Sequence, residues 1–493
     1  MSHAKQLDRP KLKQTVTGFG FFALAFGSMI GVGWITTLDQ WFLAAGPGGA
    51  ILAFLAGGGL MLLIGLCYAE LTPMLPVTGG EVAYAYKAFG TSKAFLVGWF
   101  LTFGYLSVSA FEAVSIGMVL SYLFPSLNTL PLYEVYGSTV YLPHLACAFL
   151  FTGLISWINY RGVQLAMNVQ IILTFLLVAC TVLFAGAGIS QGSLENLQPL
   201  FSGATSSDSW KGILTVFVMA PFWFVGFDTI PQAAEERVSG QSVARLGLYI
   251  VLALLGSTAF YVVIMLGAGM VAPWQETVEH DLPTAAAFES ALTSSIMVKL
   301  VLTAGVIGLL TSWNGFFLAG TRVLFALGRG RIMDRRFGEM HRRYGTPHRA
   351  IILSGLVTAF AACLGRGALI AFVDVGAFCI AVAFLGVSLS LLQLRRTHPE
   401  LPRPYRLPLA PLLAGLAGVG ACFILTAMVI PGSPVVLVWP IEWLILIPLC
   451  SAGLLVWFLG KRQRAEITEI ERTHLILETQ NSDESRSGRK VIS

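Results

Sequence analysis

Long runs of uncharged, apolar residues constrain this chain more than any other feature of its sequence. Residues 19–38 contain no charged side chain, and neither do residues 412–438. Runs of about 20 such residues match the thickness of the hydrocarbon core of a membrane. Because backbone groups in lipid must be paired within the protein, only helices and closed barrels cross it. Barrel strands are short and alternate in polarity, so these continuous runs predict transmembrane helices.

The composition agrees with a polytopic membrane protein and excludes an ordinary water-soluble domain. Hydrophobic residues make up 56% of the 493 residues and charged residues 12%, against about 25% charged in soluble domains. The sequence predicts an all-α fold with about twelve spanning helices, the first of them retained rather than cleaved as a signal peptide. The expected spans are 16–43, 48–74, 94–123, 141–159, 164–188, 210–236, 246–272, 297–325, 350–365, 368–394, 409–430 and 436–459.

Lysine and arginine residues are distributed unevenly between the two sides of this predicted topology. All of them except Lys211, Lys299 and Arg366 fall on the side that carries both termini. Positive residues concentrate on the cytoplasmic side, so we expect both tails in the cytoplasm, at a plasma membrane or bacterial inner membrane. This topology accounts for the formal charge of +5 without nucleic acid. The expected partners are the lipid bilayer and a small solute.

Signals for enzymatic or cofactor chemistry are absent from the sequence. The seven cysteines fall within predicted spans without a CxxC pair, so no metal site is expected. The sequence has no Walker A motif, no HExxH motif and no catalytic triad. We therefore expect neither an enzyme nor a bound cofactor, and only a proton or a sodium ion as coupling ion.

Two of the predicted spans contain residues that interrupt a helix. The first span has three glycines within residues 27–33, and the sixth has glycine and aspartate within residues 221–231, which begin and end with proline. Each glycine weakens a helix by about 1 kcal/mol and allows a ligand to approach the backbone closely. Ordinary helix packing in membranes also uses glycine, and that is the alternative for the first break taken alone.

The two interrupted spans lie five helices apart, so that each opens a block of five. Blocks with an odd number of helices enter the membrane from opposite sides, which predicts inverted repeats over 16–190 and 205–396. The remaining parts are an N-tail (1–15), two further helices (408–460) and a C-tail (461–493). Interrupted helices at matching positions of two inverted halves indicate a transporter site at the midplane.

The chemistry of this site follows from the backbone groups that a break releases. N–H groups at the start of the second half-helix attract a carboxylate. Carbonyl groups at the end of the first half-helix attract an ammonium group or a metal cation. Two such breaks therefore suit a zwitterion such as an amino acid.

Several motifs resemble the amino acid–polyamine–organocation (APC) transporter superfamily. Residues 27–33 are similar to its G-x-x-I-G-x-G signature, and residues 68–81 resemble its Y-A-E-L…P-x-x-G-G-E stretch. Residues 226–236 look like its span 6 signature, and residues 322–329 resemble the end of its span 8, with threonine in place of serine just before them. The match covers roughly residues 15–460.

The resemblance implies a five-plus-five inverted repeat with two additional helices and a substrate site between the breaks of spans 1 and 6. It implies that the first break holds the substrate carboxylate, that the second receives the amine and that Phe222 acts as an aromatic gate. Several relatives carry a lysine in span 5, where this chain has Thr174 as the corresponding coupling candidate. The expected substrate-binding residues are Ser28, Met29, Ile30, Gly31, Val32, Gly33, Phe222, Trp223, Phe224, Val225 and Gly226.

Polar residues within the predicted spans are candidates for ion coupling and gating. A carboxylate such as Glu112 costs about 3 kcal/mol or more at the bilayer centre, so it should be protonated, paired or facing the cavity. Asp228 belongs either to the site or to the cap of the second half-helix of span 6. Thr311, Ser312 and Asn314 offer oxygen ligands for sodium, or else hydrogen bonds between helices.

Five charged residues near cytoplasmic helix ends are read as gate salt bridges, with solvation at the surface as the alternative: Glu70, Glu81, Glu235, Glu236 and Arg322. Together these features predict a secondary transporter of an amino acid or related amine, with proton-coupled symport or exchange as the first mechanism. A sodium-coupled symporter or a polyamine exchanger is the alternative. A channel or a non-transporting scaffold is less favoured, because neither needs paired breaks around one solute.

Overall fold

The structure is a computed structural model that describes residues 8–203, 205–279, 284–285, 287 and 295–478. Within these residues, ten helices are long and apolar enough to cross a membrane, and two shorter apolar helices accompany them. The two shorter ones lie at the predicted spans 350–365 and 436–459. The all-α membrane fold is thus confirmed.

The helical elements follow the predicted spans to within a few residues at most of their ends. In chain order they are α1 (Gly18–Met29), α2 (Gly33–Thr36), α3 (Leu38–Met74), α4 (Gly80–Phe89), α5 (Thr91–Leu123), α6 (Leu142–Arg161), α7 (Val163–Gln191), α8 (Ser206–Met219), α9 (Thr229–Ala233), α10 (Arg245–Val271), α11 (Trp274–Thr277), α13 (Ser295–Arg329), α14 (His348–Ala362), α15 (Gly365–Thr397), α16 (Ala410–Ala427), α17 (Trp443–Leu459), α18 (Lys461–Arg464) and α19 (Glu469–Leu477). Short 3-10 turns cover Pro125–Leu127, Leu194–Leu197, Ala220–Phe224, Ala234–Glu236 and Arg335–Gly338, and one hairpin pairs β1 (Pro131–Val135) with β2 (Ser138–Tyr141).

Both predicted interruptions are present. Helix α1 ends at Met29, and Ile30 has the non-helical angles φ −103° and ψ 85° before α2 begins. Helix α8 passes into a 3-10 turn at Pro221, and Gly226, with φ 134°, separates that turn from α9. A further kink at Gly46 (φ 71°, ψ 166°) divides α3 into two helical segments, which agrees with the predicted boundary between spans 1 and 2.

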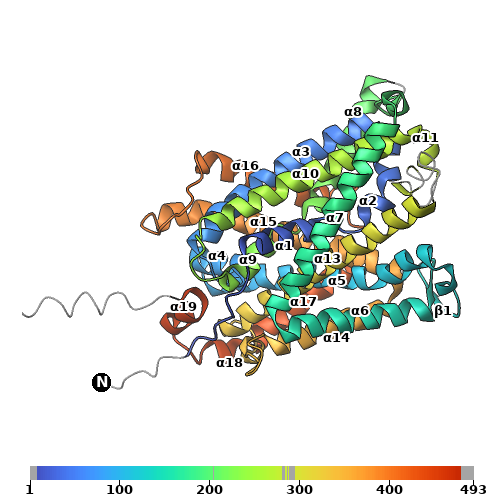
Figure 1. Ribbon diagram of the computed structural model, residues 1–493. Coiled ribbons are helices and arrows are strands. Elements are labelled where there is room, and N and C mark those ends of the chain that lie inside the picture. Colours follow the sequence, from blue (N-terminus) through green and yellow to red (C-terminus); the bar gives the residue numbers. More distant parts are fainter. Residues whose placement is uncertain (1–7, 204, 280–283, 286, 288–294, 479–493) are drawn as a thin grey trace, which may run out of the picture.

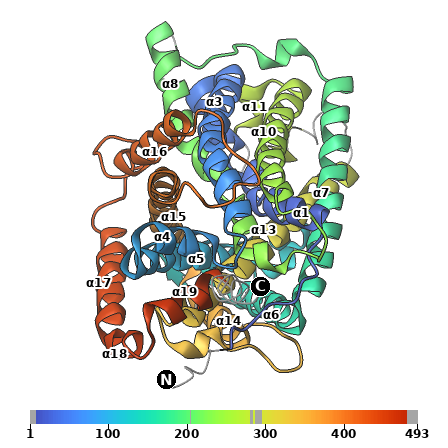
Figure 2. The ribbon, with the colours of Figure 1, turned by 90° about the vertical axis from the view of Figure 1, so that its left-hand side faces the viewer.

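The interrupted first helix lies in the centre of the bundle. In the most apolar stretch of the first span, 72% of the residues are buried, and the same share is buried in the span that contains α13. In α6 and α7 the buried shares are only 28% and 33%. Figure 2 shows α13 in the middle of the bundle and α16, α17 and α7 at its edge. The central position shields the released backbone groups of α1 from lipid.

The two ends of the bundle differ in what they carry. The N-terminal segment and α19 lie at one end, and the β1–β2 hairpin lies at the other (Figure 1). We refer to these ends as the tail side and the hairpin side. Helix α4, on the tail side, is not among the predicted spans, because it has only 10 residues and left-handed glycines, Gly79 and Gly90, at its ends.

Close contact between α7 and α10 depends on one glycine. A Cβ atom at Gly188 would lie 2.5 Å from the carbonyl oxygen of Gly267, whereas a Cβ at Gly186 would meet nothing within 4 Å. Gly186 is exposed on the same helix. The two positions therefore separate the effect of packing from the effect of helix propensity.

We expect Gly188→Ala to lower the thermal stability of the purified protein, because the added methyl group forces two backbones apart at a cost of about 1–3 kcal/mol. Gly186→Ala is the matched control and should leave stability unchanged or raise it, since alanine favours the helix by about 1 kcal/mol. Melting temperatures in detergent measure both. Equal melting temperatures for the two variants would contradict the close crossing.

Candidate functional site

The two helix breaks lie directly against each other. A Cβ atom at Gly226 would approach the backbone nitrogen of Met29 to 2.8 Å. The hydroxyl group of Tyr261, on α10, donates to the carbonyl oxygen of Met29 (3.0 Å) and also to that of Trp223 (3.2 Å). One side chain thus pairs backbone groups from both breaks. Tyr261 could not be predicted as a site residue, because it stands among apolar residues of α10 without a motif around it.

A cavity of about 440 Å³ extends from the breaks toward the hairpin side. Its lining includes Arg366, next to the hairpin, and residues 434–438 of the loop between α16 and α17. Ten of the residues expected at the site line it: Ser28, Met29, Gly31, Val32, Gly33, Glu112, Phe222, Trp223, Val225 and Ser312. Seven do not: Ile30, Thr174, Phe224, Gly226, Asp228, Thr311 and Asn314.

Glu112 is buried in the wall of this cavity, beside the first break. Its Oε1 atom lies 3.1 Å from the position that a Cβ on Gly31 would occupy, and the hydroxyl oxygen of Ser312 lies 3.6 Å from the same position. Its Oε2 atom has no hydrogen-bond partner among the described residues. The carboxyl group therefore faces the unwound backbone of the first span without a basic side chain to neutralise it.

Asp228 holds the second break rather than lining the cavity. Its carboxylate accepts a hydrogen bond from the hydroxyl of Tyr105 (2.8 Å) and another from the backbone N–H of Gly226 (3.0 Å). The side chain makes no capping hydrogen bond to the first turn of α9. Asp228 therefore neither caps α9 nor lines the cavity, and it stabilises the backbone of the second break instead.

Thr174, Thr311 and Asn314 belong to a buried polar cluster on the other side of α1. The cluster is centred on Gln170, whose amide donates to the carbonyl oxygens of Ala23 (3.2 Å) and Thr311 (3.1 Å) and accepts from Asn314 (2.8 Å). The hydroxyl of Thr174 donates to the same oxygen of Ala23. A single glutamine amide thus ties α7, α1 and α13 together. Its position in an apolar helix gave no sequence signal beyond its polarity.

Two further carboxyl groups in the cavity were missed. Asp374, on α15, and Glu442, which precedes α17, both line the cavity together with Arg366. None of these residues takes part in an ion pair within 4 Å in the described part of the chain. The sequence did contain a signal for this site, because Asp374 is an acidic residue inside the predicted span 368–394.

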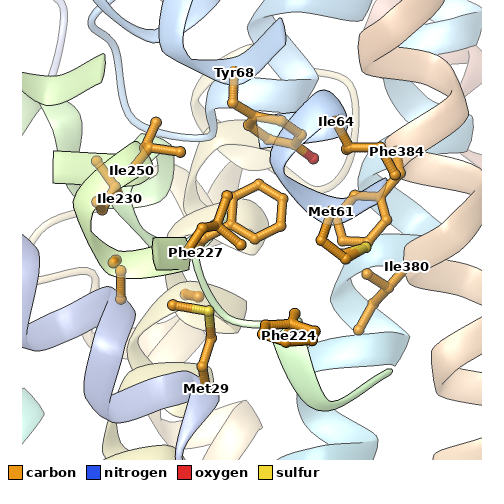
Figure 3. Packing of buried hydrophobic residues seen from close by; sticks show 14 of the residues in the cluster. Met29, Met61, Ile64, Tyr68, Phe224, Phe227, Ile230, Ile250, Ile380 and Phe384 are labelled. Atoms are coloured by element: carbon orange, nitrogen blue, oxygen red, sulfur yellow. The ribbon is translucent and has the colours of Figure 1, made fainter. Parts of the chain in front are cut away.

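Toward the tail side, a layer of large apolar side chains closes the path from the cavity. The ring of Phe227 lies 5.2 Å from that of Tyr68 and 5.5 Å from that of Phe384. Figure 3 shows these rings together with Met29 and Ile380, which line the cavity. The layer therefore separates the cavity from the charged residues beyond it.

Buried ion pairs follow this layer on the tail side. Arg322 and Glu236 are fully buried and approach to 2.7 Å. Glu235 is paired with Arg9 at 3.0 Å and with Arg329 at 2.9 Å. These pairs connect the end of the sixth span to α13 and to the N-terminal segment, so that the tail side is closed.

Glu70 and Glu81 differ in whether they form a salt bridge. Glu70 is paired with Arg395 at 2.5 Å and with Arg403 at 3.2 Å, as expected for a gate residue. The expectation of a salt bridge at Glu81 is wrong for the described residues. Glu81 is fully buried and accepts a hydrogen bond from Gln232 instead, because no basic side chain reaches its position.

Comparison with known proteins identifies transporters over nearly the whole chain. Residues 16–451 match the family described as amino acid permease. A methylthioribose transporter of Bacillus subtilis (strain 168) is 27% identical over 467 residues, 92% of this chain and 95% of that protein. The branched-chain amino acid permease BcaP of the same organism is 26% identical over 466 residues, 93% and 95% of the two chains. Cationic amino acid transporter 9, chloroplastic, of Arabidopsis thaliana is 29% identical over 334 residues, 66% and 56%.

We expect Glu236→Gln to open the tail side, because it leaves Arg322 buried without a counter-charge at a cost of about 3–5 kcal/mol. Hydrogen–deuterium exchange should then be faster in peptides that cover residues 229–236 and 322–329. The matched control is Glu339→Gln, which breaks an exposed ion pair with Arg349 (3.2 Å) and should have no effect there. Exchange at the wild-type rate in Glu236→Gln would show that this pair does not hold the tail side closed.

Proposed function

Since the chain belongs to the amino acid permease family, we propose that it is a secondary transporter of an amino acid or a related small amine, and not an enzyme. The observation that carries this proposal is the meeting of two interrupted helices at one cavity that is closed on the tail side. We further propose that it works by alternating access in a plasma or bacterial inner membrane, with both tails in the cytoplasm. On that orientation the structure represents an outward-facing state.

The substrate is held by the two breaks. Its carboxylate binds the N–H groups that begin α2, near Gly31 and Gly33, where the positive end of the helix dipole favours an anion. Its amine binds carbonyl groups of the second break, near Phe222 and Trp223. Similar relatives are named for methylthioribose, branched-chain amino acids and cationic amino acids, so the family supports the transport of small solutes without choosing among them.

Proton coupling follows from the position of Glu112. Its carboxyl group lies against Gly31, beside the place proposed for the carboxylate of the substrate. Two ionised carboxylates at this distance in a buried site repel each other strongly. Binding of a proton to Glu112 removes the repulsion, so proton and substrate bind together. A substrate without a carboxylate, such as a polyamine, would instead pair with ionised Glu112.

Sodium coupling is the less favoured alternative. The carbonyl oxygens of Ala23 and Thr311, which a cation between α1 and α13 would use, already accept hydrogen bonds from Gln170. Asn314 is hydrogen-bonded to the same glutamine. The side-chain oxygen of Asn314 accepts a hydrogen bond from Asn159 (3.0 Å), so this oxygen and the two carbonyl oxygens already have neutral donors as partners.

The proposal is tested by a thermal-shift screen of the purified protein against single amino acids, polyamines and small amines. A ligand at a hundred times its dissociation constant adds about 2.7 kcal/mol of stability. A hit should then be taken up by proteoliposomes that contain the protein and not by empty ones. A folded sample that responds to no member of the panel would overturn the proposed substrate class.

We expect Glu112→Gln to reduce uptake driven by an inward proton gradient by roughly tenfold or more, equivalent to about 1.4 kcal/mol, because glutamine cannot exchange a proton. Glu134→Gln, at an exposed residue of the hairpin, is the control and should transport normally. Both are measured as initial rates in proteoliposomes. Unchanged gradient-driven uptake in Glu112→Gln would remove this residue from the coupling mechanism.

We also expect uptake to remain unchanged when choline replaces sodium on both sides of the membrane. The reason is that the carbonyl oxygens between α1 and α13 already accept hydrogen bonds from Gln170. A protonophore should abolish accumulation under the same conditions. Loss of uptake in choline, with the proton gradient intact, would favour the sodium-coupled alternative.

A further inference from the structure

The cavity contains more acidic than basic side chains. Glu112, Asp374 and Glu442 line it, and Arg366 is the one basic residue among its lining residues. Within the described residues, none of the three carboxyl groups lies within 4 Å of a lysine, arginine or histidine nitrogen. This differs from the tail side, where Glu70, Glu235 and Glu236 are all paired with arginine.

Asp374 and Glu442 form a pair that brings together two separate helices. Their carboxyl groups interact directly, and because two ionised carboxylates in one buried site repel each other, the pair holds one proton. Glu442 also accepts a hydrogen bond from the backbone N–H of Val438 at 2.6 Å, so the loop that lines the cavity holds this side chain in place. The pair with one proton retains one negative charge that faces the cavity.

Other polar groups in the cavity wall are left without partners. The hydroxyl of Ser115 and the Oε2 atom of Glu112 are buried, line the cavity and have no hydrogen-bond partner in the described part of the chain. Buried polar groups without partners destabilise a protein by about 1–3 kcal/mol each. A ligand rich in hydrogen-bond donors would satisfy these acceptors.

The charge balance identifies the kind of ligand. With Glu112 protonated in the substrate-bound state proposed above, the Asp374–Glu442 pair with one proton carries the remaining negative charge, and within the described residues no basic nitrogen lies within 4 Å of it. Isolated charges in a low-dielectric site are costly unless they are neutralised. A zwitterion held at the two breaks leaves the charge of the pair without a close partner, whereas a substrate with an additional positive charge on its side chain pairs with it.

We propose that the substrate is a cationic amino acid, and that the Asp374–Glu442 pair binds the ammonium or guanidinium group at the end of its side chain. This inference rests on the proposed function, because it assumes that the two breaks hold the α-carboxylate and the α-amine. The pair then acts as the specificity site for the side chain. A pair that carries two protons would instead accept neutral side chains and serve only to fasten the loop.

The experiment compares lysine with norleucine, which has the same number of side-chain carbons and no ε-ammonium group. Inhibition constants of both are measured against a labelled substrate found in the ligand screen, with wild-type protein in proteoliposomes. Lysine should bind at least about tenfold more tightly than norleucine, a difference of ~1.4 kcal/mol. The double variant Asp374→Asn, Glu442→Gln removes the charge that the pair retains, so it should weaken lysine binding by a similar factor and abolish the preference for lysine over norleucine.

Asp208→Asn is the matched control, since Asp208 is exposed on the hairpin side of α8, is ion-paired with Lys211 (3.6 Å) and accepts a hydrogen bond from Thr205 (2.7 Å). It should preserve the preference for lysine. Norleucine binding equal to or tighter than lysine binding in the wild type overturns the inference and leaves the proposed transport function intact. Absence of binding for both ligands and for every other amino acid and amine overturns the inference and the proposed function together.

Discussion

The interruption of two helices inside the membrane is the constraint on which the rest of this structure depends. Each break releases backbone N–H and carbonyl groups, and lipid offers them no partners. The hydroxyl of Tyr261 is hydrogen-bonded to a carbonyl group from each break, and the carboxylate of Asp228 accepts a hydrogen bond from the N–H group of Gly226. The breaks therefore persist only where α10 and the second half of the sixth span supply these partners. The remaining free groups face the cavity, where a substrate can pair with them.

The breaks and the spans could be predicted from the sequence because their causes are local. Glycine and proline act on their own backbone, and a run of apolar residues identifies a membrane helix without knowledge of its neighbours. Tyr261 and Gln170 could not be assigned in this way. Their roles depend on the direction in which each side chain leaves a helix that is apolar on all faces, and this direction is fixed only by packing. The same limit explains why Asp374 was seen as part of a span and not as part of the cavity.

The charged residues show the same division between local and distant causes. Their position near cytoplasmic helix ends marked Glu235, Glu236 and Arg322 as gate candidates, and all three form buried pairs. Arg9 escaped notice because it lies 226 residues from Glu235 along the chain. Glu81 is another of these candidates, yet it bonds to Gln232, since no basic side chain reaches it. Charge and position selected these gate candidates, and three-dimensional neighbours decide which of them are paired.

The two ends of the path through the protein are in opposite electrostatic states. On the tail side Glu70, Glu235 and Glu236 are paired with arginines, while among the described residues the acids of the cavity have no basic partner within 4 Å. Opening the tail side separates buried pairs such as Arg322–Glu236, and this separation is costly because each charge is then left alone in a low-dielectric environment. A substrate shifts such an equilibrium only by the difference between its affinities for the two states. On the proposed alternating-access mechanism, a ligand that merely filled the cavity of this state would stabilise it and stop transport. The substrate would therefore make its strongest contacts after the cavity has begun to close and its lining residues, such as Phe222 and residues 434–438, reach it.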